Sequence, residues 1–219
     1  MKDIISILKS VGAMSENSHF IGNSGRHLPM YVKKDVLLMH TQKTSEACKL
    51  FALKFKSKNI DIVVAPSIAG IPLSQWTAYH LSKICKKEVL SIFTEKNDEN
   101  DQVLKRGYDA VVKNKRVLVI EDTTTTGGSV KKVVNSVKKA GGKIIAVCVL
   151  VNRDPELVNS KTIGAPFSSL GVFRISSYEV KDCPMCKAKI PINTTLGHWK
   201  KFAKLQKVTS LLNKKGLIK

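Results

Sequence analysis

The chain has 219 residues, 43% of them hydrophobic, and a formal net charge of +20 at pH 7. This length accommodates one domain with a sizeable core, and no apolar run approaches the roughly 18 residues that a membrane-spanning helix needs. The first ten residues contain one short apolar patch and no small-residue cleavage site, so we expect no signal peptide. The composition therefore predicts a globular protein without a membrane partner.

The apolar pattern alternates between helix and strand along the chain. A short helix is predicted over 3–13, followed by a small β-hairpin or hood. Helices are also predicted at 44–58, 70–87, 128–140 and from Thr195 onward, and strands at 61–66, 88–93, 117–121, 143–151 and 170–176, with a polar loop at 94–102. Such alternation predicts an α/β fold with a doubly wound, mostly parallel sheet and helices on both faces.

The domain organisation predicted from this pattern is a single domain over 1–219. Its parts are an N-terminal hood at about 14–40, a core at about 41–175 and a C-terminal segment at about 176–219. The C-terminal segment carries a CxxC pair and a basic amphipathic helix.

The stretch "VLVIEDTTTTGGS", at 117–129, joins an apolar run to an acidic pair and a polar loop. The apolar residues predict a strand buried on both faces. The threonines and glycines suit a tight loop whose N–H groups and hydroxyls converge on an anion at the start of the next helix. The carboxylates of Glu121 and Asp122 are suited to accept hydrogen bonds from the vicinal hydroxyls of a ribose or to hold a divalent cation. The alternative is a structural Gly/Thr-rich turn, and the spacing fits neither the P-loop nor GxGxxG.

This stretch resembles the phosphoribosyl-pyrophosphate motif of the type I phosphoribosyltransferases, and the resemblance implies their fold. In that family the acids contact the ribose hydroxyls and the loop holds the 5′-phosphate. The residues so assigned are Glu121, Asp122, Thr123, Thr124, Thr125, Thr126, Gly127, Gly128 and Ser129. The resemblance further implies a catalytic role for Asp122 and Mg²⁺ as cofactor, held directly or indirectly by Glu121 and Asp122.

A second loop, "APSIAGIP" at 65–72, resembles the pyrophosphate-binding loop of the same family. The resemblance implies that the backbone amides of Ser67, Ile68 and Ala69 face the diphosphate, in the family often through a cis peptide. A plain strand-to-helix turn would have the same sequence pattern.

Two further segments narrow the resemblance to the orotate phosphoribosyltransferases. "HFIGNSGRHLPMYV" (19–32) is similar to their hood, and "LVNRDPE" (150–156) places Arg153 where they have an arginine for the orotate carboxylate. A guanidinium is suited to that task because it binds a carboxylate through two parallel hydrogen bonds. The implied orotate-binding residues are Tyr31, Val32, Thr125 and Arg153. A surface arginine at a strand end is the alternative for Arg153.

The chain departs from the family in its lysines. Asn23 and Ala69 stand where the family often has lysine, and the segment 94–106, which corresponds to the mobile catalytic loop, retains Lys96 as its leading cation. By resemblance we expect this segment to be a lid, Lys96 to be catalytic, and the chain to be a homodimer in which the lid serves the neighbouring subunit.

Three functions follow. The first is transfer of ribose 5-phosphate from phosphoribosyl pyrophosphate to orotate, giving orotidine 5′-phosphate and pyrophosphate in pyrimidine synthesis. The second is the same reaction on another purine or pyrimidine base. The third is a phosphoribosyl-pyrophosphate-sensing regulator that binds nucleic acid without turnover. Nucleic acid is disfavoured because only five of the 37 basic residues are arginines and no aromatic residues alternate with them.

The five cysteines form an odd set, with Cys48, Cys85 and Cys148 inside apolar segments, which predicts reduced thiols in the cytoplasm. "CPMC" at 183–186 is half of a zinc site, and His198 is the candidate third ligand beside Cys183 and Cys186. A fourth ligand would be Cys85, Cys148 or water. A reversible disulfide and two uncommitted thiols are the alternatives.

Overall fold

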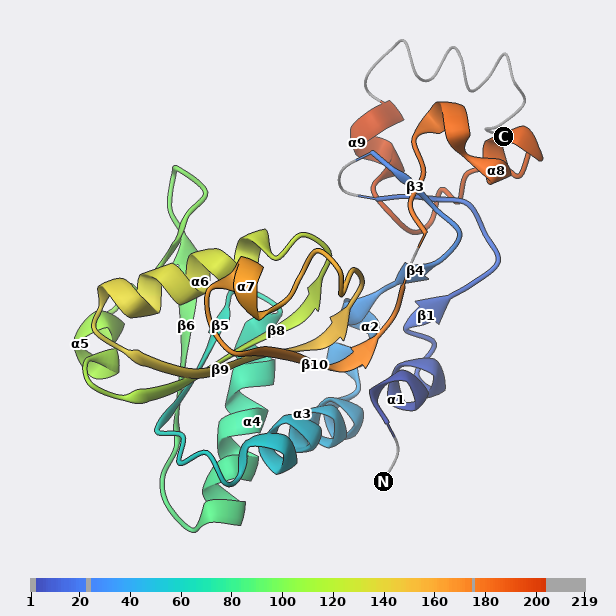
Figure 1. Cartoon of the computed structure of the whole chain (residues 1–219). Helices are drawn as coiled ribbons and strands as arrows, with labels where there is room; N and C mark the ends of the chain where they lie inside the picture. Colours follow the sequence, from blue (N-terminus) through green and yellow to red (C-terminus); the bar gives the residue numbers. More distant parts are fainter. Residues whose placement is uncertain (1–2, 23–24, 175, 204–219) are drawn as a thin grey trace. The chain divides into compact units, whose positions relative to one another are not determined.

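In the computed structural model, residues 3–22, 25–174 and 176–203 are described (Figure 1). The chain forms two compact units. The first contains the described residues up to Val11 and Lys34–Arg174, and the second contains the described residues of Gly12–Lys33 and of the chain after Arg174. Residues 14–33 of the predicted hood thus lie in the second unit with the described part of the predicted C-terminal segment, whereas residues 34–40 belong to the first unit. No described helix is long and apolar enough to cross a membrane.

The first unit is built on a six-stranded sheet. Its strands, in sheet order, are β10 (Phe167–Val172), β9 (Lys143–Asn152), β8 (Arg116–Thr124), β5 (Ile62–Pro66), β6 (Leu90–Lys96) and β7 (Gln102–Val103). All neighbours pair in parallel except β6 and β7, which form an antiparallel hairpin. The chain runs from β5 to β6 on one side and then to β8 on the other, so the direction of winding reverses between β5 and β8. Ligands of doubly wound sheets bind at such a reversal.

Helices cover both faces of this sheet, as predicted (Figure 1). The helices of this unit are α1 (Ile4–Ser10), α2 (Lys34–Met39), α3 (Thr41–Phe55), α4 (Gly70–Cys85), α5 (Tyr108–Val112), α6 (Gly128–Lys139) and α7 (Ser160–Ile163). α3 and α4 pack together on one face, and α6 packs on the other. Four valines of α6, at positions 130, 133, 134 and 137, are fully buried in a core cluster with alternate residues of β5, β8 and β9. Burial on both faces explains why the central strands have continuous apolar runs.

Two strands extend further than the apolar pattern predicted. β8 continues through the acidic pair to Thr124, because it pairs with β9 as far as Thr124 and Asn152. β6 runs to Lys96 and turns into β7, where a polar loop was predicted. The buried hydroxyl of Thr94 donates to the amide oxygen of Gln102 at 2.7 Å and holds this hairpin together. The last strand, β10, lies earlier than the predicted 170–176.

The second unit is small and largely irregular. Its elements are β1 (Met14–Ser15), β2 (Phe20–Ile21), β3 (His27–Leu28), β4 (Tyr31–Val32), a 3₁₀ turn (Val180–Asp182), α8 (Pro184–Lys187) and α9 (Trp199–Ala203). β1 pairs with β4 and β2 with β3, both antiparallel, which agrees with the predicted small β hood. Its core cluster has two buried apolar residues, Ile21 and Ile192. Of the predicted tail helix, only the part up to Ala203 is described, and Asn23 and residues 204–219 lie outside the described residues.

Candidate active site

The carboxyl ends of three neighbouring strands bring the predicted loops of the first unit to one edge of the sheet. β5 ends at Pro66 before the Ser67–Ala69 loop, β8 ends at Thr124 before the threonine loop, and β9 ends at Asn152 before Arg153. Since β8 lies between β5 and β9, the threonine loop is flanked by the other two. This edge is also where the winding reverses, which makes it the expected ligand site of the fold.

The threonine loop is folded as a cradle at the N-terminus of α6. The N–H of Gly127 donates to the Thr124 hydroxyl at 2.9 Å, while Thr125, Thr126 and Ser129 are exposed. Gly127 has a φ of 75°, and a Cβ there would lie 2.8 Å from Cδ1 of Ile163, so only glycine fits this position. The N-terminus of a 12-residue helix and the exposed hydroxyls therefore face outward, as an anion-binding loop requires.

The two acids at the end of β8 are buried side by side. Glu121 is 6% exposed and Asp122 is 2% exposed. Burial, together with the neighbouring charge of Asp122, raises the pKa of Glu121 to about 8. Oε2 of Glu121 makes no hydrogen bond to any residue that the structure describes. The site thus holds a buried carboxyl oxygen that can accept a hydrogen bond from a donor such as a sugar hydroxyl.

Lys34, at the start of α2, neutralises the second acid. Its Nζ lies 2.6 Å from Oδ2 of Asp122, whose side chain is 3% exposed. Lys34 carries no distinguishing signal in the sequence, because Lys33 and Lys34 are adjacent and nothing local separates them. Only the docking of α2 beside β8 selects Lys34.

We expect Lys34→Met to destabilise the chain, because it leaves the buried Asp122 carboxylate without its cation while keeping most of the aliphatic stem. The Lys34 side chain is 42% exposed, so the loss should be below that of a fully buried pair, about 1–2 kcal/mol. This corresponds to a decrease of roughly 2–8 °C in Tm. Differential scanning calorimetry would measure it. Lys33→Met, which changes an exposed neighbour, is the matched control, and equal losses in both variants would contradict the role of the ion pair.

The Ser67–Ala69 loop, predicted to bind a diphosphate, joins β5 to α4. The peptide between Ser67 and Ile68 is cis. The Ser67 N–H donates to the Thr94 carbonyl at 2.8 Å, so this amide is not available to a diphosphate as predicted, whereas Ile68 is 85% exposed. Ala69 caps the N-terminus of the 16-residue helix α4. The N-terminus of α4 therefore lies at the same edge of the sheet as the N-terminus of α6, which follows β8.

Arg153 is placed beside the threonine loop by the backbone. Its N–H donates to the Thr124 carbonyl at 2.9 Å, directly after the last paired residues of β8 and β9. The buried Asn152 shapes the next turn, since its side chain donates to the Val158 carbonyl at 3.0 Å and accepts from the Asp154 N–H at 3.1 Å. Arg153 thus follows a strand end and begins a hydrogen-bonded turn next to Thr125.

The predicted lid, 94–106, contains the β6–β7 hairpin. Lys96 is exposed and has no ion pair among the described residues. Two acids of the segment are paired: Glu95 with Arg106 at 2.7 Å, and Asp101 with Lys132 of α6 at 3.2 Å. These two acids therefore have cations other than Lys96 as partners.

Tyr31 and Val32, predicted to contact orotate, belong to β4 of the second unit. Val32 is 4% exposed, and the half-buried Tyr31 ring lies 5.7 Å from that of Phe20. Within this unit, both residues are part of the packing around the β1–β4 pair.

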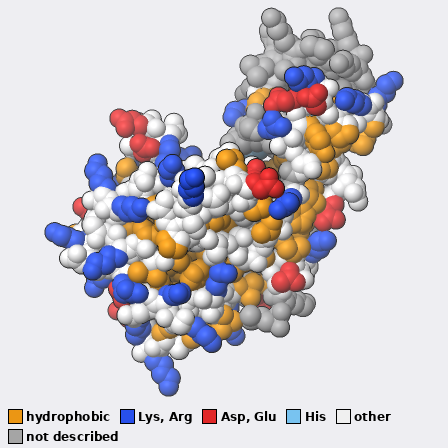
Figure 2. All heavy atoms as spheres, in the orientation of Figure 1, with side chains coloured by type: hydrophobic (Ala, Val, Ile, Leu, Met, Phe, Trp, Pro, Cys, Tyr) orange, Lys and Arg blue, Asp and Glu red, His pale blue; other side chains and the backbone are white. Residues whose placement is uncertain are grey.

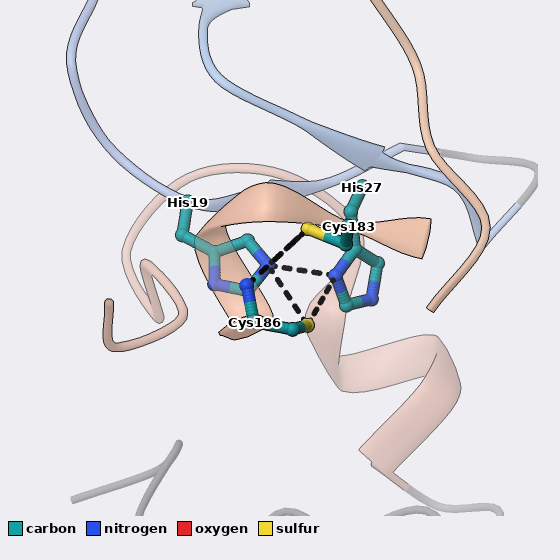
Figure 3. Close-up of side chains that lie close together, drawn as sticks. All are labelled: His19, His27, Cys183 and Cys186. Atoms are coloured by element: carbon teal, nitrogen blue, oxygen red, sulfur yellow. Dashed lines mark hydrogen bonds between the residues drawn. The ribbon is translucent and has the colours of Figure 1, made fainter. Parts of the chain in front are cut away.

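The CxxC pair lies close to histidines other than the predicted one. Ligand atoms of Cys183, Cys186, His19 and His27 lie within 4.8 Å of one another (Figure 3). His198 is exposed, and its ring lies 6.4 Å from that of Tyr31. The predicted set of Cys183, Cys186 and His198 is therefore wrong in its histidine, because His19 and His27 come from a hairpin about 160 positions earlier in the chain. The sequence signal for these ligands is two histidines eight residues apart in the hood.

Cys85 and Cys148, considered as fourth ligands, are not part of this cluster. They lie in the first unit, at the end of α4 and within β9, respectively. None of the five cysteines, all of which are described, takes part in a disulfide.

Comparison with known proteins agrees with this architecture. Residues 40–163 match the phosphoribosyl transferase domain family. An orotate phosphoribosyltransferase of Caldanaerobacter subterraneus subsp. tengcongensis is 36% identical over 174 residues, which are 80% of this chain and 86% of the relative. A crystal structure of the Mycobacterium tuberculosis H37Rv orotate phosphoribosyltransferase has a TM-score of 0.62 and 20% identity, covering 78% of this chain and 97% of that chain.

The fold is also similar to that of an adenine phosphoribosyltransferase of Thermoanaerobacter pseudethanolicus, with a TM-score of 0.53 and 18% identity over 66% of this chain and 88% of that chain. Because orotate and adenine phosphoribosyltransferases both have similar folds, the fold does not identify the acceptor base. The 36% sequence identity to the first relative identifies the branch of the family. The chain belongs to the phosphoribosyl transferase domain family and, within it, to the orotate phosphoribosyltransferases.

Proposed function

We propose that this chain transfers the 5-phosphoribosyl group of phosphoribosyl pyrophosphate to orotate, producing orotidine 5′-phosphate and pyrophosphate. The observation that carries the proposal is the position of Arg153, whose N–H bonds to the Thr124 carbonyl next to the anion-binding loop. A guanidinium at this place can bind the carboxylate of an acidic base while the sugar phosphate occupies the neighbouring loop. Two relatives that are 36% and 34% identical to this chain are both named orotate phosphoribosyltransferase.

The sugar phosphate is assigned to the loop of β8. The outward N–H groups at the start of α6 and the exposed Thr125, Thr126 and Ser129 hydroxyls supply donors for the 5′-phosphate. Glu121 Oε2, which is buried and lacks a hydrogen bond to any described residue, would accept from a ribose hydroxyl. The Ser67–Ala69 loop would hold the diphosphate at the N-terminus of α4.

In the reaction, the bond between C1′ and the diphosphate oxygen breaks, and a bond between C1′ and a ring nitrogen of orotate forms. Positive charge develops on the ribose, and the Asp122 carboxylate would stabilise it. Lys34 pairs with Asp122 at 2.6 Å and so supplies a cation beside this buried side chain. The remaining contribution is alignment of two bound reactants, which lowers the entropic cost of their encounter.

Mg²⁺ is the cofactor that the family implies, and the residues present fit it. Glu121 and Asp122 supply oxygen ligands of the kind that Mg²⁺ prefers, either directly or through its bound water. When bound, Mg²⁺ would neutralise charge on the diphosphate as it departs. Because Asp122 already has Lys34 as partner, we infer that these acids orient a Mg²⁺–substrate complex and do not enclose the ion by themselves.

We also propose a homodimer in the cytoplasm in which Lys96 acts on the diphosphate of the neighbouring subunit. Its exposure and the pairing of two nearby acids with Arg106 and Lys132 support this role. Mixing a Lys96→Ala variant with an Asp122→Asn variant tests it. Activity restored in the mixture above the sum of the two variants would support sharing, whereas no restoration in a dimer would contradict it.

A steady-state assay with Mg²⁺ and phosphoribosyl pyrophosphate tests the proposed reaction. Orotate, uracil, adenine and hypoxanthine would be compared as acceptors, with loss of orotate absorbance as the direct readout. Turnover with orotate alone is the expected result. Preferential turnover with another base would show a different phosphoribosyltransferase. Binding of phosphoribosyl pyrophosphate without turnover, accompanied by salt-dependent nucleic-acid binding, would indicate a regulator. In Figure 2, Lys and Arg side chains are scattered over the visible face among other side chains, which favours the enzyme.

A further inference from the structure

The second unit contains a cluster of four side chains that the phosphoribosyl transfer does not use. His19 lies just before β2 and His27 begins β3. Cys183 directly precedes α8, and Cys186 lies within it. All four point toward one another (Figure 3). His19, His27 and Cys183 are buried, and Cys186 is half-buried. A group of two imidazoles and two thiols in one buried place is the donor set of a tetrahedral zinc site.

The distances among the four ligand atoms are close to those required by one zinc ion. With Zn–N near 2.0–2.1 Å and Zn–S near 2.3 Å, the edges of a tetrahedron measure about 3.3–3.8 Å. Sγ of Cys183 and Sγ of Cys186 lie 3.7 and 3.8 Å from Nε2 of His19. Sγ of Cys186 lies 3.2 Å from Nδ1 of His27, and the two imidazole nitrogens are 2.7 Å apart. Small outward movements of these imidazoles would place an ion between all four atoms.

Contacts outside the cluster orient the ligands. Nδ1 of His19 lies 2.8 Å from the Ile190 carbonyl, which can only accept, so this nitrogen carries the proton. The lone pair of His19 is then on Nε2, the atom that faces the cysteines. The backbone N–H of Cys186 donates to Sγ of Cys183 at 3.5 Å. A carbonyl on the outer nitrogen of a histidine and an N–H on a sulfur are the contacts that support metal ligands in proteins.

Backbone pairing holds the histidines against the C-terminal segment. His27 and Tyr178 exchange two N–H to carbonyl bonds of 2.9 Å each. The Asn193 N–H donates to the His19 carbonyl at 2.7 Å. The two histidines are therefore held against the C-terminal segment by main-chain hydrogen bonds, and not by their side chains alone.

We infer that His19, His27, Cys183 and Cys186 bind one structural zinc ion that joins the N-terminal hairpin to the C-terminal segment. All four coordination positions are filled by the protein, so none remains for substrate, which distinguishes a structural from a catalytic site. Such a cross-link suits this small unit, in which Ile21 and Ile192 form one core cluster and Phe20, Leu28 and Val32 are also buried. Small units with little apolar burial are commonly stabilised by a metal.

Metal analysis of the whole chain tests this inference. After washing with a weak chelator, we expect one equivalent of zinc per chain by plasma mass spectrometry. X-ray absorption should show two sulfur ligands at about 2.3 Å and two nitrogen ligands at about 2.0 Å. These measurements use the parent chain, so they do not depend on whether a variant folds. No zinc after incubation with the ion, a Cys183–Cys186 disulfide by mass, or absorption without two sulfurs would overturn the inference.

Variants then identify the histidines. His27→Ala and the pair Cys183→Ser with Cys186→Ser should lose most of the zinc. His198→Ala and Cys85→Ser should retain one equivalent, as matched changes of a neighbouring histidine and of a half-buried cysteine outside the cluster. A strong chelator should lower the Tm of the parent and leave that of the double cysteine variant unchanged. Loss of zinc in His198→Ala with retention in His27→Ala would contradict the assignment. Loss of orotate turnover alone would bear on the proposed reaction and not on the metal.

Discussion

Replacing Arg153 by alanine should lower kcat/KM for orotate on the order of a hundredfold. Two charge-assisted hydrogen bonds to the orotate carboxylate would be lost, and a net contribution of about 3 kcal/mol to the transition state corresponds to a factor of that size. Binding of phosphoribosyl pyrophosphate should change little, because the backbone N–H of residue 153 still donates to the Thr124 carbonyl in the variant. Steady-state kinetics and calorimetric titration would separate the two effects.

Two variants serve as controls for this result. Arg153→Lys keeps the charge but loses the planar fork, so an intermediate loss is expected. Arg116→Ala removes an arginine from the other end of β8, where its side chain donates to the carbonyls of Asn59 and Lys58 at 2.9 and 3.1 Å, and should leave kcat/KM nearly unchanged. An unaltered kcat/KM in Arg153→Ala, or a loss confined to phosphoribosyl pyrophosphate binding, would contradict the carboxylate-binding role.

Asp122→Asn should lower kcat on the order of a thousandfold, with a smaller decrease in Tm than Lys34→Met, because the Lys34 ammonium that loses its partner is 42% exposed and can be hydrated. The substitution preserves the shape of the side chain and removes the negative charge that would face the developing positive charge on the ribose. Loss of one such preorganised electrostatic contact typically costs a factor of about 10²–10³ in kcat. Single-turnover kinetics at saturating substrate would measure the chemical step directly.

Asp109→Asn is the matched control, because Asp109 is exposed in the first turn of α5. We expect its kcat to equal that of the parent. A thousandfold loss accompanied by a large decrease in the Tm of Asp122→Asn would show instead that the carboxylate acts through the fold. A kcat close to that of the parent would exclude Asp122 from the chemical step.

The core of the first unit was determined largely by the sequence itself. Fully buried strands leave continuous apolar runs such as "VLVI", and an amphipathic helix leaves valines at the spacing of α6. The loop at 121–129 could also be predicted from the sequence, because its acids, threonines and glycines are contiguous in the chain. β8 is longer than predicted and continues to Thr124, because its polar residues pair with β9. Such pairing between strands is not encoded by the local preferences of the residues.

Contacts between distant segments were decided only by the tertiary structure. Lys34 is distinguished from Lys33 by its ion pair with Asp122, and His198 follows Cys186 by twelve residues yet lies outside the cluster. His19 and His27 meet Cys183 and Cys186 because part of the hood and the chain after Arg174 fold into one unit. Periodicity and motif spacing report interactions over a few residues, whereas an ion pair or a metal site depends on where the chain returns in space. The sequence by itself therefore determined the sheet, its helices and the phosphate loop, and the tertiary structure decided the partners of their charged and metal-binding side chains.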